Sequence, residues 1–302
     1  MQTTSQTNPR KPDWLKIQLR VGKNYSDLKE IVSHGNLHTV CQEALCPNIY
    51  ECWDRRAATL MILGDVCTRS CGFCNVKTGR PTWHDPDEPQ RTAEAVRQMG
   101  LKHCVITSVN RDELLDGGAA IWAETIRAIH ELNPDCTLEV LIPDFKGDET
   151  PLKTICDANP EILGHNIETV PRLYSAVRPQ ADYLQSLDVL RRSKKFGMRT
   201  KTAMMVGLGE MKGEVIETIK KVAETGCDIL AIGQYLQPTR DHHAVDRYVH
   251  PSEFDFYREE GLKQGLKWVE SGPLVRSSYH ADAQATALIN KVCISRKLLF
   301  MA

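Results

Sequence analysis

The 302-residue chain lacks several features that would assign it to a class at once. No apolar run approaches the roughly 20 residues that a membrane-spanning helix needs, so we expect no membrane segment. Basic residues are not in excess, since 38 Lys and Arg stand against 39 Asp and Glu. A nucleic-acid partner needs a basic surface and is therefore not expected. The polar N-terminus, MQTTSQTNPRKPDW, has no apolar signal core, which favours a cytoplasmic protein.

Cysteine is the residue that this chain has in unusual number, with eleven copies. Disulfides could explain them in a secreted protein, but the number is odd, the chain is long and no export signal is seen. Intracellular thiols stay reduced, so clustered cysteines are more often metal ligands. Five cysteines are instead scattered among apolar neighbours and are predicted to be small buried side chains: Cys104, Cys136, Cys156, Cys227 and Cys293.

The other six cysteines form two triplets with different spacings. The first is C-x4-C-x5-C, and the second, within CTRSCGFC, is C-x3-C-x2-C. Three thiolates can hold three corners of a [4Fe–4S] cluster and leave the fourth iron open to another ligand. A structural zinc site usually needs four ligands from paired C-x2-C knuckles, and neither spacing fits that pattern. We therefore predict two clusters, held by Cys41, Cys46 and Cys52 and by Cys67, Cys71 and Cys74.

Apolar runs alternate with amphipathic stretches from residue 59 onward. The pattern predicts strands at 59–65, 103–108, 137–143, 161–169, 199–209 and 228–236, and helices at 91–100, 117–132, 148–158, 181–197, 213–225 and 252–271. Strict alternation implies an α/β fold with a parallel sheet, either doubly wound or an open barrel. The second triplet directly follows the first strand, and chemistry at the carboxyl ends of strands favours the barrel.

Polar residues at the ends of later strands support the same choice. These are Thr107, Ser108, Asn166, Glu168, Lys201, Gln234 and Gln237. Residues 1–58 precede the repeat and residues 272–302 follow it, so we expect both to be extensions that cover the open face. The domain boundaries predicted are thus 1–58, with the first triplet, 59–271 for the barrel, and 272–302.

The second triplet resembles the motif of the radical SAM superfamily, C-x3-C-x-aromatic-C, with Phe73 as the aromatic residue. The resemblance implies a partial (β/α)6 TIM-like barrel. It also implies that the fourth iron binds S-adenosylmethionine, which is cleaved to a 5′-deoxyadenosyl radical. The cofactor then carries the difficult chemistry, while the protein positions it and excludes water.

Four segments in order resemble lipoyl synthases: CQEALCPNIYECW, LGDVCTRSCGFCNV, VNRDELLDGGA and RSSYHA. The likeness extends from about residue 14 to 282. It implies insertion of two sulfur atoms, at C6 and C8 of an octanoyl chain linked to a lysine of a carrier domain. The auxiliary cluster on the first triplet is the sulfur source, and the two cofactors implied are S-adenosylmethionine and a pair of [4Fe–4S] clusters.

The resemblance also implies roles for single residues. A serine of RSSYHA ligates the fourth iron of the auxiliary cluster, and by position we favour Ser278 over Ser277. An oxygen ligand is harder and weaker than a thiolate, which would let this iron leave. Arg276 is expected to orient the reacting centre. The residues implied at the S-adenosylmethionine site are Phe73, Asn75, Thr107, Ser108, Asn166, Glu168 and Arg178.

The partners implied are octanoylated lipoyl domains of 2-oxoacid dehydrogenase E2 subunits and the glycine-cleavage H protein. Flavodoxin or ferredoxin would supply electrons, and an iron–sulfur carrier would renew the spent cluster; we expect a monomer. Two rival functions are another radical SAM sulfurtransferase, resembling biotin synthase, and a non-catalytic iron–sulfur electron carrier. Biotin synthases lack the first triplet and RSSYHA, and ferredoxin-like carriers are short with four cysteines per cluster.

Overall fold

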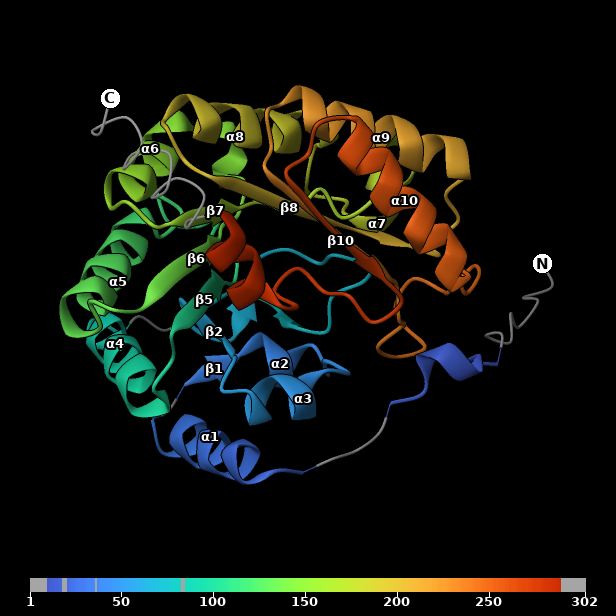
Figure 1. Ribbon diagram of the computed structural model, residues 1–302. Coiled ribbons are helices and arrows are strands. Elements are labelled where there is room, and N and C mark those ends of the chain that lie inside the picture. Colours follow the sequence, from blue (N-terminus) through green and yellow to red (C-terminus); the bar gives the residue numbers. More distant parts are fainter. Residues whose placement is uncertain (1–9, 18–20, 36, 83–84, 289–302) are drawn as a thin grey trace, which may run out of the picture.

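A computed structural model describes residues 10–17, 21–35, 37–82 and 85–288. Its centre is an eight-stranded sheet in the order β1-β2-β5-β6-β7-β8-β9-β10 (Figure 1). Seven neighbouring strands are parallel, and β1 pairs antiparallel with β2. The strands are β1 His38–Thr39, β2 Thr59–Ile62, β5 His103–Ser108, β6 Thr137–Leu141, β7 Ile162–Gly164, β8 Thr200–Val206, β9 Ile229–Gln234 and β10 Trp268–Gly272. Two short strands, β3 Val66–Cys67 and β4 Lys77–Thr78, pair separately.

Helices cover the outer side of this sheet. They follow the strands in sequence, as a right-handed parallel arrangement requires. The outer helices are α4 Glu88–Met99, α5 Ala119–Leu132, α6 Glu149–Asp157, α8 Tyr183–Lys195, α9 Lys212–Glu224 and α10 Pro251–Lys263, with the single turn α7 Tyr174–Val177 before α8. Figure 1 shows them in an arc around the strands. The predicted partial barrel is confirmed. Among the described strands, β1 and β10 are the two edges of the sheet and do not pair with each other to close it.

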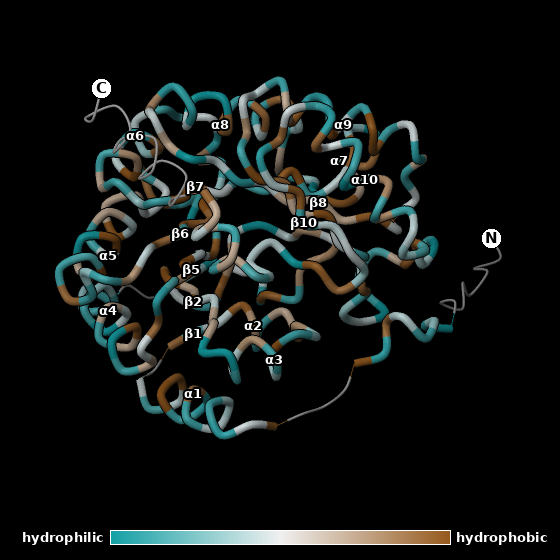
Figure 2. Tube along the Cα trace, viewed as in Figure 1, coloured by the Kyte–Doolittle hydropathy of each residue, from teal (hydrophilic) through white to brown (hydrophobic). Residues whose placement is uncertain are grey.

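The core lies between the strands and the outer helices. In α5, the side chains of Trp122, Ile126 and Ile129 lie on one face, at helical spacing, and are fully buried. All four residues of β2 are buried as well, as expected for a strand of a parallel sheet. Figure 2 shows hydrophilic residues on the outer turns of the helices and hydrophobic ones toward the sheet. Four of the five scattered cysteines are buried as predicted, and Cys293 lies outside the described residues.

The C-terminal part of the repeat differs from the prediction. The helix predicted over 252–271 ends at Lys263, and residues Trp268–Gly272 form a seventh parallel strand, β10, beside β9. Gly265 has a φ of +95°, and the amides of Gly265 and Leu266 donate to the carbonyls of Leu262 and Gly261. This is a Schellman motif, which ends a helix.

The strand predicted over 161–169 is also shorter, because regular pairing stops at Gly164. The chain touches the sheet again at Glu168, which makes a single bridge to Met204. Glu168 has a φ of +64°, a left-handed conformation that is uncommon outside glycine and is found at functional sites.

The two chain extensions meet at the β2 edge of the sheet, where β1 pairs with β2 and Ser278 contacts Thr59. The N-terminal one contains the 3-10 turn Asp13–Leu15, α1 Lys23–His34, β1, and the short helices α2 Val40–Glu43 and α3 Ile49–Asp54. Figure 1 shows α2 and α3 beside the C-terminal segment that follows β10. None of the helices in the described ranges combines the length and apolar character needed to span a bilayer.

Candidate active site

A cavity of about 540 Å³ opens at the carboxyl ends of the strands. The loop after β2 contributes Cys67, Cys71 and Cys74 to its wall, together with Phe73 and Asn75. The ends of β5 and β9 and the segment after β7 line the same space, as the barrel hypothesis predicts. Residues of the two chain extensions, including Leu15 and Ser277, complete the lining.

The cysteine loop is fixed by a buried ion-pair network that the sequence did not reveal. Arg69 donates to both carboxylate oxygens of Asp112, at 2.7 and 2.9 Å, and to both of Asp144, at 2.6 and 2.8 Å. Although burial acts in the opposite direction, the Arg69 guanidinium lowers the pKa of Asp144 to about 2. The backbone amides of Arg69 and Asn110 point at the Cys67 sulfur, at 3.4 and 3.3 Å.

Two adjacent histidines hold the other side of the same loop. His242 Nε2 is 2.9 Å from the Cys74 carbonyl, and the His243 amide donates to the Gly72 carbonyl at 2.7 Å. His243 Nε2 contacts the Leu208 carbonyl at 2.9 Å. The loop between the cysteines is therefore tied to the barrel by side chains from the segment after β9.

The predicted S-adenosylmethionine residues converge on this cavity. Thr107, Ser108, Asn166, Glu168 and Arg178 all line it. Arg178 Nη1 donates to the Asn166 carbonyl at 2.9 Å and to Tyr174 Oη at 3.0 Å. Burial raises the pKa of Glu168, while the positive charge of Arg178 and a hydrogen bond from Asn166 oppose that rise.

Several polar atoms in the cavity wall are ready for a polar ligand. Within the described residues, Ser108 Oγ, Arg178 Nε and His165 Nε2 are buried and have no hydrogen-bond partner. Buried polar atoms are costly unless they are paired. This donor set fits a zwitterionic ligand with amino and carboxylate groups, as S-adenosylmethionine has.

One predicted strand-end residue does not reach the cavity. Lys201 is the second residue of β8, so it lies at the opposite end of the sheet, where Nζ donates to Glu139 at 2.8 and 3.0 Å. Gln234 and Gln237 do line the cavity, although Gln234 donates its amide to the carbonyls of Tyr235 and Arg247.

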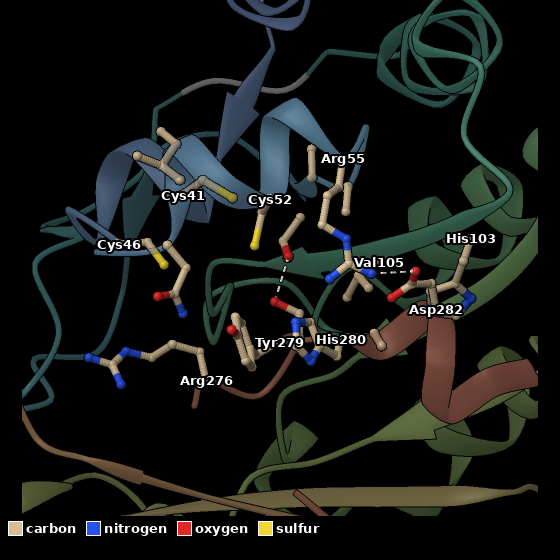
Figure 3. A pocket seen from close by; sticks show the side chains of 17 residues that line it. Cys41, Cys46, Cys52, Arg55, His103, Val105, Arg276, Tyr279, His280 and Asp282 are labelled. Carbon is tan, nitrogen blue, oxygen red and sulfur yellow. Dashed lines mark hydrogen bonds and ion pairs between the residues drawn. The ribbon is translucent and has the colours of Figure 1, made fainter. Parts of the chain in front are cut away.

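A second cavity is lined by the first triplet. Figure 3 shows Cys41, Cys46 and Cys52 with their sulfur atoms directed into the space that the C-terminal segment closes. Burial raises the pKa of Cys41 to about 11 and that of Cys52 to about 12, so both thiols hold their protons until a metal displaces them. Trp53 Nε1 is buried, and the Trp53 side chain donates a hydrogen bond to the Cys41 thiol, which opposes the rise in the pKa of Cys41.

The two serines of RSSYHA face different cavities. Ser278 lines the second cavity with the first triplet, whereas Ser277 lines the first. Ser278 Oγ accepts a hydrogen bond from Thr59 Oγ1 at 2.8 Å. Arg276 lines both cavities, so it forms part of the wall between them.

Polar contacts hold the C-terminal segment against α3. Asn48 Nδ2 donates to the Leu274 carbonyl at 2.7 Å, and Arg55 pairs with Asp282 at 3.1 Å, as Figure 3 also shows. Tyr279 Oη reaches Glu51 at 3.3 and 3.4 Å.

Asn75 links the two segments that carry the cysteine triplets, since its side chain donates to the Glu43 carbonyl at 2.8 Å.

The arrangement of both triplets differs from that of a mononuclear metal site. Among the described residues, no group of three or more His, Cys, Asp or Glu side chains is placed to hold one metal ion. A zinc site draws its thiolates to about 2.3 Å from a single ion. The cysteines here surround a space instead, which suits a cluster with separated corners.

Sequence reasoning missed the supporting residues for a common reason. Arg69 and Asp144 are 75 positions apart, and Thr59 and Ser278 are 219 positions apart. The one local signal was Arg69 itself, because a charged residue stands inside the cysteine motif.

Sequence comparisons match both the barrel region and the N-terminal region of this chain to known protein families. Residues 61–222 match the radical SAM superfamily, and residues 1–46 match the N-terminal domain of lipoyl synthase of the radical SAM family. The lipoyl synthase of Rubrobacter xylanophilus is 58% identical over 91% of this chain and 86% of its own length. The lipoyl synthase of Geobacillus thermodenitrificans is 53% identical over 98% of this chain and 99% of its own.

Solved structures share the fold at low sequence identity. Streptococcus suis SuiB bound to S-adenosylmethionine aligns with a TM-score of 0.57 and 11% identity, covering 82% of this chain and 62% of SuiB. Methylornithine synthase (PylB) aligns with a TM-score of 0.51 and 14% identity over 82% of each chain. These likenesses concern the fold alone. On its sequence relatives, the chain belongs to the lipoyl synthase family of the radical SAM superfamily, and it is an enzyme, a radical SAM sulfurtransferase, of a family that uses S-adenosylmethionine and two [4Fe–4S] clusters.

Proposed function

We propose that this enzyme inserts two sulfur atoms, at C6 and C8, into an octanoyl chain carried on a lysine of a lipoyl carrier protein. The observation that carries the proposal is the shared wall of the two cavities. Each cavity is lined by one cysteine triplet, and Arg276 belongs to both linings. An acyl tail near Arg276 would therefore reach a hydrogen-abstracting centre on one side and a sulfur source on the other.

We assign the first cavity to cofactor binding. Cys67, Cys71 and Cys74 would hold a [4Fe–4S] cluster, which with S-adenosylmethionine supplies the radical chemistry that unactivated C–H bonds require. The unpartnered Ser108 hydroxyl and the Arg178 guanidinium would bind the amino acid portion, because a guanidinium matches a carboxylate in geometry. Glu168 and Asn166 would accept and donate hydrogen bonds at the ribose hydroxyls, with Thr107 beside them.

Two other residues of the first cavity have supporting roles in this proposal. Phe73 would shield the cluster from water, since it lies between Cys71 and Cys74 and packs on the apolar core. Asn75 would keep the two cysteine segments at a fixed separation through its bond to the Glu43 carbonyl.

We assign the second cavity to sulfur donation. Cys41, Cys46, Cys52 and Ser278 would hold the auxiliary cluster, with the serine oxygen as the weakest ligand. The choice of Ser278 over Ser277 rests on which cavity each one lines. Arg276 would orient the acyl tail at the wall between the cavities. Its Nη1 donates to the Val275 carbonyl at 2.7 Å.

The finer partner assignments are part of the same proposal. The acceptors would be lipoyl domains of 2-oxoacid dehydrogenase E2 subunits and the glycine-cleavage H protein. Flavodoxin or ferredoxin would supply electrons, and an iron–sulfur carrier would replace the consumed cluster. We propose that the protein works as a monomer in the cytoplasm.

Anaerobic incubation with an octanoyl-lysine peptide, S-adenosylmethionine and dithionite tests the function. Mass spectrometry should find 5′-deoxyadenosine and a peptide that has gained two sulfur atoms. Cys71→Ala should reduce both products to background. Cys41→Ala should abolish the sulfur-containing peptide while some 5′-deoxyadenosine is still formed.

The same assay separates the rival functions. A non-catalytic electron carrier would form neither product. Another sulfurtransferase would cleave the cofactor but leave the peptide mass unchanged. If Cys41→Ala still made the lipoyl product, the sulfur-donor role of the first triplet would be wrong.

A further inference from the structure

We infer that Thr59 is a positioning residue for the auxiliary cluster, acting through Ser278. The inference rests on the proposed function, because it takes Ser278 as the oxygen ligand. Thr59 Oγ1 donates to Ser278 Oγ across 2.8 Å. Both side chains line the cavity that holds the first triplet.

The two partners differ in how firmly the fold holds them. Thr59 is 5% exposed and opens β2, where it pairs in register with Val105 of β5. Its β-branched side chain has few accessible rotamers in a strand. Ser278 lies in a turn after β10 and is half-buried. A rigid donor therefore fixes the direction of a less constrained ligand.

Thr59 also contacts a second proposed ligand. Its backbone amide donates a hydrogen bond to the thiol sulfur of Cys41. One residue thus offers a hydrogen bond to a sulfur ligand and another to the oxygen ligand. Hydrogen bonds to ligand atoms orient them and tune how firmly a metal centre is held.

The chemical consequence concerns the iron at the oxygen corner. A serine oxygen bound to iron carries negative charge, and a hydrogen bond to a charged atom is about twice as strong as a neutral one. Thr59 would retain Ser278 at the cluster in the resting enzyme and restrict iron loss to turnover. Without the Thr59 hydroxyl, this iron should leave early.

The test measures anaerobic release of ferrous iron to a colorimetric chelator. The background is a full-length variant with Cys67, Cys71 and Cys74 changed to alanine, so that the auxiliary cluster is the one observed. Thr59→Val should release its first iron about ten-fold faster, the factor expected for one lost hydrogen bond to a charged atom. Thr59→Ser keeps the hydroxyl and should restore the original rate. Thr125→Val is the matched control, since Thr125 is a fully buried threonine of α5 that bonds to the Ile121 carbonyl.

A second background distinguishes positioning from a general structural role. With Ser278→Cys, the ligand is a thiolate that depends less on an oxygen-directed donor, so Thr59→Val should change the rate by less than about two-fold. The inference would be overturned if Thr59→Val still accelerated iron release in the Ser278→Cys background. It would also be overturned if Thr59→Val left the rate of iron release unchanged, or slowed it, where Ser278 is present. If Ser278→Ala releases iron at the original rate, the ligand assignment in the proposed function fails instead.

Discussion

The two cysteine sites differ in how the chain builds them. The first comes from one loop of one strand–helix unit, and its supports are a buried ion-pair network and two histidines. The second joins α2 and α3 from the N-terminal side to a segment more than 200 residues later. A permanent cofactor site needs the first kind of support. Under the proposed function the second site gives up its contents, and a wall that is a separate piece of chain would suit such a site.

The largest expected effect would test the support of the first site. Arg69→Met leaves two carboxylates unpaired, and Asp144 is buried. Breaking a buried pair by removing one partner costs about 3–5 kcal/mol. Urea unfolding should show this loss, and cluster content at the first site should fall.

Lys77→Met is the matched control for that change. Lys77 pairs with Asp65 at 2.6 Å next to the same loop, but its side chain is 69% exposed. Little change in unfolding is therefore expected. Equal effects of the two substitutions would show that burial of the Arg69 network is not what fixes the loop.

The second site should be more sensitive to the placement of the C-terminal segment. A Cβ added at Gly233 would lie 2.0 Å from the Val275 carbonyl oxygen, so Gly233→Ala must displace the segment that carries Ser278. Iron analysis should fall from about eight toward about four per chain, the content of a single cluster. S-adenosylmethionine cleavage should decline less than sulfur insertion.

Gly213→Ala provides the control for the glycine substitution. Gly213 lies in the first turn of α9 with no atom within 4 Å of an added Cβ, so the change should be neutral or slightly stabilising. Full iron content in Gly233→Ala would contradict the close packing inferred for the second site.

A pH effect of intermediate size is expected at the first cavity. Burial, with the charge of Arg178, lowers the pKa of His165 to about 4, and Nδ1 is bonded to the Ile142 carbonyl. The unfolded chain binds a proton near pH 6.5, so the contribution of neutral His165 is complete above that pH and is lost as the pH falls toward 4. Between pH 7 and 5 the loss is about 2 kcal/mol in the free energy of unfolding.

Urea unfolding at both pH values measures this loss, with His165→Gln as the comparison. The variant should depend less on pH than the parent over this range. Identical pH dependence in the two proteins would mean that His165 binds its proton equally in the folded and unfolded chain, so that its pKa is not lowered by folding.

The smallest effect is expected where the second site is exposed. Tyr279→Phe removes a long hydrogen bond to Glu51 at the surface. The change in unfolding free energy should stay within about 0.5 kcal/mol. A larger loss would show that this contact, rather than the Asn48 bond to Leu274, fastens the segment.

Local signals explain which predictions succeeded. The helix predicted over 181–197 ends in the structure at Lys195, where the amides of Gly197 and Met198 donate to the Lys194 and Ser193 carbonyls. Gly265 ends α10 by the same motif, yet the apolar residues Leu266 and Val269 continued the helical pattern and hid it. A turn motif competing with hydrophobic periodicity is ambiguous until a neighbouring strand is known.

The cysteine positions were visible because their spacing is local, and their convergence followed from parallel topology. The pairing of Thr59 with Ser278 and of Arg69 with Asp144 depends on how distant segments fold together. No sequence pattern of a single chain encodes such pairs. Lys201 was misplaced for another reason. The predicted strand starts at residue 199 and the observed one at Thr200, so Lys201 lies at the amino end of the strand in both and not at its carboxyl end.

The order of residues along the chain determines which parts of the two cysteine sites are synthesised first. Cys41, Cys46 and Cys52 leave the ribosome early, whereas Ser278 and the residues that bond to Asn48, Glu51 and Arg55 are among the last to be synthesised. The loop with Cys67, Cys71 and Cys74 still needs Asp144 and His242 from the middle and later parts. During translation, the early thiols are therefore made before their closing segment, and under the proposed function the auxiliary cluster would be delivered to a nearly finished polypeptide.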